Sequence, residues 1–182
     1  KLLGPHCAAI AAKPELLKTL NNDKLLPATS NVPERFEFGT LPYELMAGCT
    51  AAIDYLANMV EGGPVGRRQR IIHSMTALEK YEDELFKYLK TEIAALPGIT
   101  LYGQAKKRTP TIYFNLKGIE GAAVYQHLAG LKINSPAGNF YALEASRALG
   151  LEDKGAVRAG LAPYSNTDDV NRLIAGLREL AK

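Results

Sequence analysis

The chain has few of the residues that build covalent or metal-bound scaffolds. It is 182 residues long and contains two cysteines, Cys7 and Cys49, and three histidines. Two cysteines cannot form a disulfide framework, and no Cys/His spacing matches a metal site. A reducing compartment is the simplest cellular location for such a chain. We therefore expect a cytoplasmic protein without a bound metal.

Long apolar runs are also missing. No run approaches the ~18 apolar residues that a membrane helix needs. The first residues, KLLGPH, lack the hydrophobic stretch and the small-residue cleavage site of a signal peptide. They also lack an initiator methionine. We expect no membrane partner, and we expect the chain to begin inside a longer protein.

Charge is nearly balanced, with 22 basic and 19 acidic residues and a formal net charge of +3. The basic clusters at residues 67–70 (RRQR) and 106–108 (KKR) are short and contain no aromatic residues. Nucleic-acid-binding proteins usually concentrate positive charge on one face. We interpret both clusters as solvated surface and expect no nucleic-acid partner.

The first third of the chain predicts too few elements for a domain of its own. Residues 7–12 are apolar and follow Gly4-Pro5, which predicts a buried strand after a turn. Residues 13–41 predict a long loop with at most a helical turn near residues 15–20. Pro42 opens a helix that Gly62 and Gly63 end. One strand, one loop and one helix cannot bury their own apolar faces, so residues 1–64 predict the trailing part of a larger domain.

The remaining residues, 65–182, predict a small α+β domain. Apolar residues at helical spacing predict a helix over residues 65–96. Further strands are predicted at 99–102, 111–116, 132–134 and 156–161, and helices at 120–130 and 142–150. The last helix is the clearest, with Thr167 as its cap and acidic residues in its first turn. This order predicts helices packed on one face of a sheet.

Self-contained chemical motifs are absent from the sequence. The glycines at 62, 63 and 66 do not form a dinucleotide fingerprint, and no phosphate-binding loop with Gly-Lys-Ser/Thr is present. The spacing of serines, histidines and aspartates indicates no catalytic constellation. Cys7 falls in the predicted strand and Cys49 on the apolar face of a helix, so we expect both thiols to be packed in a core.

Six short stretches carry a resemblance that covers essentially the whole chain. Each is weak alone, but together they occur in the order found in cysteine-desulfurase-like proteins: residues 1–6 (KLLGPH), 32–40 (VPERFEFGT), 42–56, 138–142 (GNFYA), 155–161 (GAVRAGL) and 164–167 (YSNT). The chain thus resembles the C-terminal portion of a class V aminotransferase. The resemblance implies an α/β enzyme of fold type I that uses pyridoxal 5'-phosphate (PLP). Residues 1–64 would then be the remainder of its large domain, and residues 65–182 its small domain.

The resemblance implies roles for four residues. Lys1 corresponds to the lysine that bonds covalently to PLP, and Gly39 with Thr40 to a pair that reaches the cofactor phosphate of the other subunit in a homodimer. Arg158 corresponds to the arginine that holds the α-carboxylate of an amino-acid substrate. It lies in a strand that is otherwise apolar, where an unpaired charge is costly. The alternatives are an ordinary terminal lysine for Lys1, an ordinary turn for Gly39 and Thr40, and a surface arginine or an ion-pair partner for Arg158.

One departure from the family pattern limits what the resemblance implies. Cysteine desulfurases carry a nucleophilic cysteine on a loop, and the corresponding residue here is Tyr141. The nearby arginine of the family is replaced by Pro136. A tyrosine cannot accept a persulfide sulfur, so desulfuration, transamination and other reactions at Cα remain open. The alternative to an enzyme is a non-catalytic dimerisation or regulatory domain without a cofactor.

Overall fold

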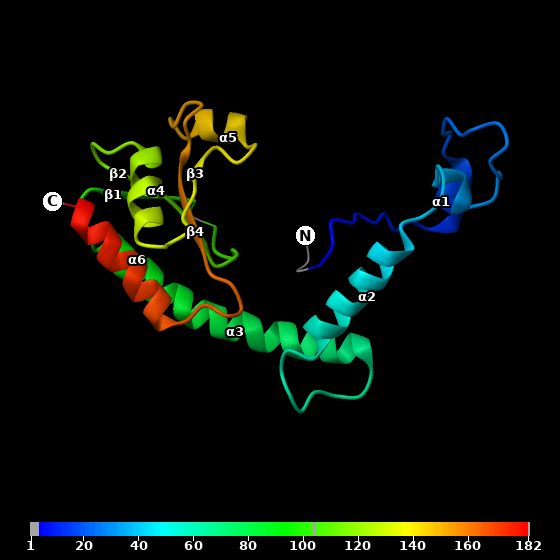
Figure 1. Ribbon diagram of the computed structural model, residues 1–182, viewed down its shortest axis with the longest axis horizontal. Helices are drawn as coiled ribbons and strands as arrows, with labels where there is room; N and C mark the ends of the chain where they lie inside the picture. Colours follow the sequence, from blue (N-terminus) through cyan, green and yellow to red (C-terminus); the bar gives the residue numbers. More distant parts are fainter. Residues whose placement is uncertain (1–3, 104, 182) are drawn as a thin grey trace. The chain divides into compact units, whose positions relative to one another are not determined.

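The computed structural model describes residues 4–103 and 105–181 (Figure 1). The prediction for Lys1 therefore lies outside the described residues. The chain divides into two compact units, Lys1–Met75 and Thr76–Lys182. The division falls within the long helix α3, Arg67–Ala94. Each unit is described by itself.

The first unit consists of short helices joined by extended chain. Helix α1 spans Pro14–Thr19, a single 3-10 turn, η1, spans Glu34–Phe36, and α2 spans Tyr43–Ala57. Pro42 lies at the N-cap of α2, as its fixed φ predicts. Ser74 on α3 is fully buried, and its hydroxyl donates a hydrogen bond to the Ala57 carbonyl at 3.2 Å. This bond ties the end of α2 to the start of α3.

The strand predicted at residues 7–12 is wrong. These residues have no regular structure, and all of them are exposed. A strand needs a neighbour for its backbone N–H and C=O groups. The described residues of this unit supply no such neighbour, so the apolar run alone does not form a strand.

The second unit is built on a four-stranded sheet. Its strands are β1 (Ile99–Tyr102), β2 (Thr111–Leu116), β3 (Ala137–Gly138) and β4 (Ala156–Gly160). The spatial order is β1-β2-β4-β3, and every neighbouring pair is antiparallel. Along β2 the burial alternates residue by residue, with Ile112, Phe114 and Leu116 buried. The alternation predicted from the sequence is therefore confirmed.

Helices cover one face of this sheet. They are the C-terminal part of α3, α4 (Gly121–Gly130) and α6 (Thr167–Leu180), while the short helix α5 spans Leu143–Ala148. Their apolar side chains meet the buried face of β2 and β4 in one core, which includes Leu89, Ile93, Phe114, Leu128, Val157 and Leu177. The predicted α/β class and the one-sided helical layer are confirmed.

Two local predictions in this unit are wrong. The strand predicted at residues 132–134 is not formed, and the strand that is formed lies at Ala137–Gly138, where the chain meets β4. The cap of α6 is Asn166 and not Thr167. Asn166 Oδ1 accepts from the N–H groups of Asp168 and Asp169, and the Asp169 carboxylate accepts from the Asn166 N–H at 3.1 Å. This reciprocal pair is a capping box, which Thr167 is one residue too late to form.

No helix among the described residues has the length and apolar character that a membrane crossing needs.

Candidate functional site

Arg158 lies on the sheet face opposite the core. Its side chain is exposed, whereas its neighbours Val157 and Ala159 are buried. Successive side chains of a strand point to opposite faces, so an apolar run can hold an exposed charge at every second position. The expectation that Arg158 is a charge inside a buried strand is wrong for this reason. Its side chain is free to meet a ligand.

The backbone of Arg158 is fixed on the β3 side of β4. Its N–H donates to the Pro136 carbonyl at 2.9 Å, and its carbonyl accepts from the Ser135 hydroxyl at 3.0 Å. Ser135 is only 1% exposed. On the opposite side, Arg158 pairs with Tyr113 of β2. The Cα of Arg158, from which its long side chain extends, is therefore held in place from both sides of β4.

The guanidinium of Arg158 lies over an aromatic ring. Its central carbon is 3.9 Å from the centroid of Phe140. No carboxylate or hydrogen-bond acceptor among the described residues pairs with this guanidinium. By contrast, Arg67, Arg147 and Arg178 each pair with an acidic side chain, at 2.7 to 3.1 Å. Arg158 thus keeps its N–H donors free on an exposed face.

Phe140 belongs to a turn that a tyrosine ties to the sheet. The hydroxyl of Tyr113 donates to the Gly138 carbonyl and accepts from the Ala156 N–H, both at 2.7 Å. Gly155 lies beside the same point with a φ of +68°, and a Cβ there would lie 2.2 Å from the Gly138 backbone. Only glycine fits this close approach.

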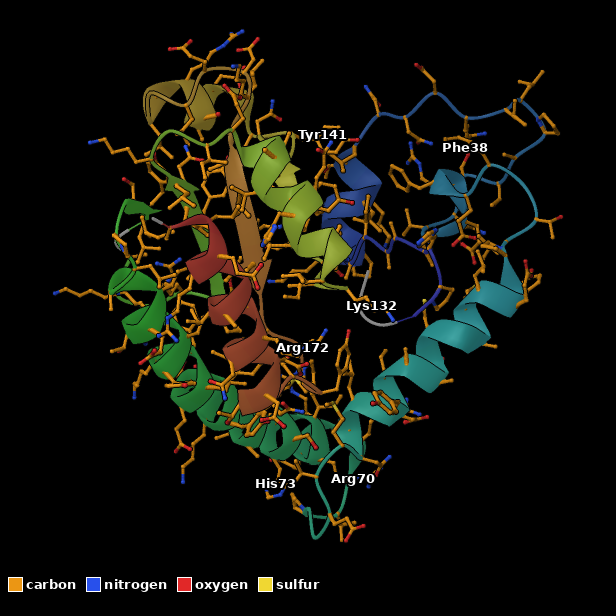
Figure 2. The ribbon with its side chains drawn as sticks, turned by 60° about the vertical axis from the view of Figure 1, so that its left-hand side comes forward. Phe38, Arg70, His73, Lys132, Tyr141 and Arg172 are labelled. Carbon is orange, nitrogen blue, oxygen red and sulfur yellow. The ribbon has the colours of Figure 1, made fainter. Side chains whose placement is uncertain are left out.

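The turn itself holds two aromatic residues in left-handed conformations. Phe140 has a φ of 53° and Tyr141 a φ of 65°. Asn139 supports them, because its Oδ1 accepts from the Tyr141 N–H at 3.1 Å and its Nδ2 donates to the Asp153 carbonyl at 3.0 Å. Tyr141 is fully exposed (Figure 2). The position that the resemblance gives to a nucleophilic cysteine is therefore an accessible phenol.

Gly39 and Thr40 form a bend in the first unit, just before α2. Both are exposed, and Gly39 has a φ of +134°, which favours glycine. A Cβ at Gly39 would have no neighbour within 4 Å, and no described residue hydrogen-bonds to the Thr40 hydroxyl. Gly39 and Thr40 belong to the first unit, and Arg158 belongs to the second.

The two cysteines differ in exposure. Cys7 is exposed and Cys49 is half-buried. Burial raises the pKa of the Cys49 thiol, and the nearby Cys7 thiol raises it further. The expectation of a packed core thiol is therefore wrong for Cys7, because the strand that would bury it is not formed. No group of His, Cys, Asp and Glu within the described ranges could hold a metal ion.

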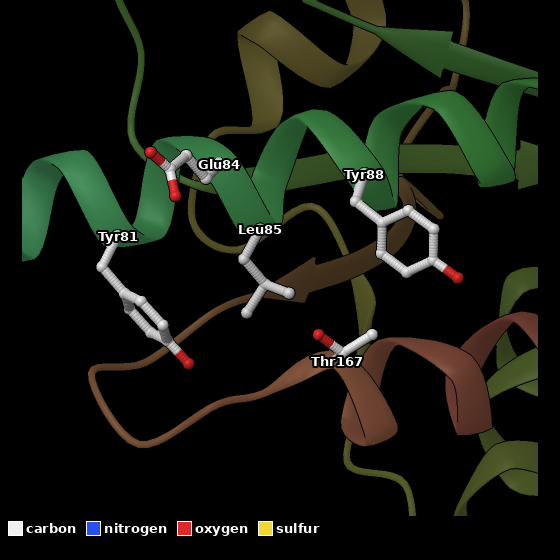
Figure 3. A pocket seen from close by; sticks show the side chains of 5 residues that line it. All are labelled: Tyr81, Glu84, Leu85, Tyr88 and Thr167. Atoms are coloured by element: carbon white, nitrogen blue, oxygen red, sulfur yellow. The ribbon is translucent and has the colours of Figure 1, made fainter.

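A small pocket of about 280 Å³ lies between α3 and the start of α6 (Figure 3). Tyr81, Leu85 and Tyr88 line it from α3, and Thr167 lines it from α6. Its two phenols already have partners, because Tyr81 donates to the Ser165 carbonyl and Tyr88 to Asn171 Oδ1, each at 2.6 Å. These bonds hold α6 on α3. The pocket is therefore explained by helix packing, and we prefer the sheet face that carries Arg158 as the candidate site.

The sequence singled out Arg158 as a candidate site residue, but it did not single out Phe140 and Tyr113, which lie beside Arg158 in the structure. Phe140 carries a weak signal, since it adjoins the family position occupied by Tyr141. Tyr113 carries no signal in the sequence, because a tyrosine at a solvent-facing position of a strand such as β2 is ordinary. Only the pairing of β3 with β4 shows what its hydroxyl does.

Comparisons with known proteins identify the family. The model for "Aminotransferase class-V" matches residues 17–173. An uncharacterized protein, MT3887, of Mycobacterium tuberculosis is 30% identical over 97% of this chain and 44% of its own length. A cysteine desulfurase of Salmonella agona is 30% identical over 83% of this chain and 33% of its own length. The chain thus spans less than half the length of these relatives.

Solved structures agree in fold. The apo cysteine desulfurase of Thermococcus onnurineus NA1 matches 88% of this chain and 37% of its own, with a TM-score of 0.69 and 24% identity. The cysteine desulfurase CsdA of Escherichia coli matches 84% of this chain and 34% of its own, with a TM-score of 0.66 and 23% identity. At these identities the likeness shows the fold. Together with the match over residues 17–173, it leads to one conclusion: the chain belongs to the class V aminotransferase family.

Proposed function

We propose that this chain is part of a PLP-dependent enzyme that acts on an α-amino acid. The proposal rests on the observation that the backbone of Arg158 is fixed by hydrogen bonds while its N–H donors are free on an exposed sheet face. Relatives are described as cysteine desulfurases, and one solved structure, with a TM-score of 0.53 and 19% identity, is described as holding glycine linked to PLP. We further propose that the enzyme is a cytoplasmic homodimer.

Arg158 would bind the α-carboxylate of the substrate. A guanidinium presents planar N–H donors that match the two oxygens of a carboxylate, and such paired hydrogen bonds fix orientation as well as position. Holding the carboxylate fixes which bond of the α-carbon faces the reacting atoms, which is how positioning lowers a barrier. PLP would supply the electron sink for chemistry at that carbon.

Gly39 and Thr40 would bind the phosphate of the cofactor. The free Thr40 hydroxyl and the backbone N–H groups of the open bend are donors of the kind that phosphate oxygens accept. In our proposal this bend serves the cofactor of the partner subunit in a two-fold dimer. Lys1, which precedes the described residues, would bond covalently to the cofactor and move the α-proton of the substrate.

Tyr141 argues against desulfuration through the turn at residues 138–142. A phenol cannot carry a persulfide, and it stands fully exposed at the tip of this turn. We therefore propose a reaction at the α-carbon that needs no thiol on this turn, with transamination as one member of that class. If L-cysteine is turned over, no persulfide should appear on Cys7 or Cys49.

Absorbance spectroscopy tests the cofactor. The whole gene product should acquire a visible absorbance band with PLP, and borohydride reduction followed by peptide mass analysis should place the label on Lys1. Light scattering should report a dimer. Label on another lysine would refute the role of Lys1, and no band after reconstitution would favour the non-catalytic alternative. A monomer that retains the cofactor would remove the argument for Gly39 and Thr40.

Substitution tests the carboxylate contact. We expect Arg158→Ala to lower kcat/KM by ~10²–10³-fold toward the amino acid that is turned over, because the substrate carboxylate loses the charge-assisted hydrogen bonds that hold it. Arg158→Lys should recover little, since an ammonium lacks the planar pair of donors. Cofactor binding should survive both changes. Unchanged kinetics in Arg158→Ala would refute the assignment.

A further inference from the structure

Phe140 stands out among the phenylalanines that contact an arginine. Its ring centroid is 3.9 Å from the guanidinium carbon of Arg158, whereas the distances for Arg35 over Phe36 and Arg108 over Phe86 are 5.5 and 5.3 Å. A carbon 3.9 Å above a ring centroid is at van der Waals contact, at the ~3.5–4.0 Å optimum. The guanidinium of Arg158 therefore rests directly on the ring.

A ring in this place leaves the hydrogen-bonding capacity of arginine intact. The five N–H donors of a guanidinium point outward in its plane, and a ring against one flat face blocks none of them. The attraction between the cation and the face of the ring is strengthened where water is excluded. Phe140 thus restrains the arginine without consuming the donors that a carboxylate needs.

Phe140 is itself restrained from two sides. Its ring meets Tyr113 edge-on, with centroids 6.2 Å apart and an interplanar angle of 70°. Asn139 holds the backbone of the turn through the Tyr141 N–H and the Asp153 carbonyl. Tyr113 in turn has its hydroxyl fixed by Gly138 and Ala156. The ring under Arg158 is therefore held by the sheet and by the turn together.

We infer that Phe140 is a positioning residue that holds the guanidinium of Arg158 flat, so that an N–H edge faces the carboxylate of the substrate. The inference rests on the proposed function of Arg158. Without the ring, the exposed side chain of Arg158 has no other described partner to limit its rotamers. Carboxylate binding would then require ordering of the side chain, which costs affinity.

The test uses the whole gene product and acetate as the carboxylate probe, with chloride at the same ionic strength as a blank. Proton–nitrogen NMR of the arginine Nε–H groups reports both the stack, through the ring-current shift of Arg158, and acetate binding. We expect Phe140→Leu to abolish the ring-current shift and to weaken acetate binding roughly two- to fivefold. Phe140→Tyr keeps the ring and should stay within about twofold of wild type.

The controls separate this inference from the proposed function. Tyr125→Leu makes a comparable aromatic-to-aliphatic change on α4 and should alter neither signal. Arg158→Lys should lose acetate binding more than tenfold. If Arg158→Lys loses binding but Phe140→Leu does not, the positioning role is refuted and the carboxylate role stands. If Arg158→Lys binds acetate as wild type does, both are refuted. Should circular dichroism show that Phe140→Leu is misfolded, Phe140→Met takes its place.

A kinetic comparison adds a readout that a structural role alone would not move. With an amino acid that the holoenzyme turns over, Phe140→Leu should raise KM more than it lowers kcat, because the ring acts on binding of the carboxylate. Phe140→Tyr should restore KM. An equal loss of kcat in the leucine and tyrosine variants, with KM unchanged, would overturn the inference.

Discussion

The two units differ in how completely they bury their own apolar side chains. Among the described residues, the sixteen that form the hydrophobic core cluster, from Leu85 to Leu177, all belong to the second unit. Within the part of the first unit that the structure describes, the buried apolar residues are Ala52 and Ala57 alone, while Ile10, Leu26 and Val65 are each at least 95% exposed. The first unit also contains Arg70, whose buried Nε has no hydrogen-bond partner among the described residues. The second unit therefore has a hydrophobic core of its own, and the first unit exposes apolar side chains that other surfaces could cover.

The strongest test of this comparison is separate expression. We expect residues 76–182 to give a cooperative thermal transition by circular dichroism and a dispersed NMR spectrum. Residues 1–75 should give neither, because two buried alanines cannot offset the conformational entropy of 75 residues. A cooperative transition in the isolated first segment would contradict the comparison.

A matched pair of core and surface substitutions should show the same difference in free energy. Phe114 is fully buried in β2, so Phe114→Ala should lower the free energy of unfolding by about 3–5 kcal/mol. Leu26 is 96% exposed, and Leu26→Ala should change it by less than about 0.5 kcal/mol. Urea denaturation of the 182-residue chain measures both. A large loss in Leu26→Ala would mean that another part of the protein covers it.

The capping box of α6 should have a smaller effect within the second unit. Asn166→Ala removes the side-chain acceptor for two N–H groups, and we expect a loss of about 1 kcal/mol. Asn166→Asp keeps an acceptor and should retain most of the stability. Thr167→Ala should cost less than Asn166→Ala, and the reverse order would refute the capping assignment.

The cysteines give the mildest test, which concerns the first unit. Alkylation requires the thiolate, and the raised pKa of Cys49 lowers its thiolate fraction. Iodoacetamide near neutral pH should therefore modify exposed Cys7 faster than half-buried Cys49, as peptide mass analysis would show. The raised pKa also favours the folded chain below the ordinary thiol pKa, and this contribution is lost as pH rises through the raised value. Equal rates would indicate that the two thiols share one environment.

The sequence predicted elements well where the signal is local. Ile99–Tyr102 and Thr111–Leu116 have the predicted bounds because alternation of apolar residues is a property of the strand itself. The strand predicted at residues 7–12 was wrong because a strand also needs a neighbouring strand with which to form hydrogen bonds. Ala137–Gly138 was missed because a two-residue strand has almost no side-chain pattern, and its place depends on β4.

The candidate site divides in the same way. The role of Arg158 was predicted from resemblance and stays a prediction, whereas its exposure follows from the pleat of β4 and not from the apolar residues around it. Phe140 could not be assigned from sequence, since its stacking on Arg158 brings together residues eighteen positions apart, with helix α5 between them. Gly155 belongs to one of the six stretches that carry the resemblance, but the physical reason for a glycine there is the Gly138 backbone beside it.

The Tyr113 hydroxyl has a consequence for how this turn can vary between proteins. Here the Tyr113 side chain takes the place of a backbone hydrogen bond between strands. Its hydroxyl donates to the Gly138 carbonyl and accepts from the Ala156 N–H. A change of tyrosine to phenylalanine would delete that single atom while keeping the ring and the strand. The tightness of the turn is thus adjustable by one atom, without any change in the turn's own residues, so selection can alter from a neighbouring strand how firmly residues 138–142 are tethered.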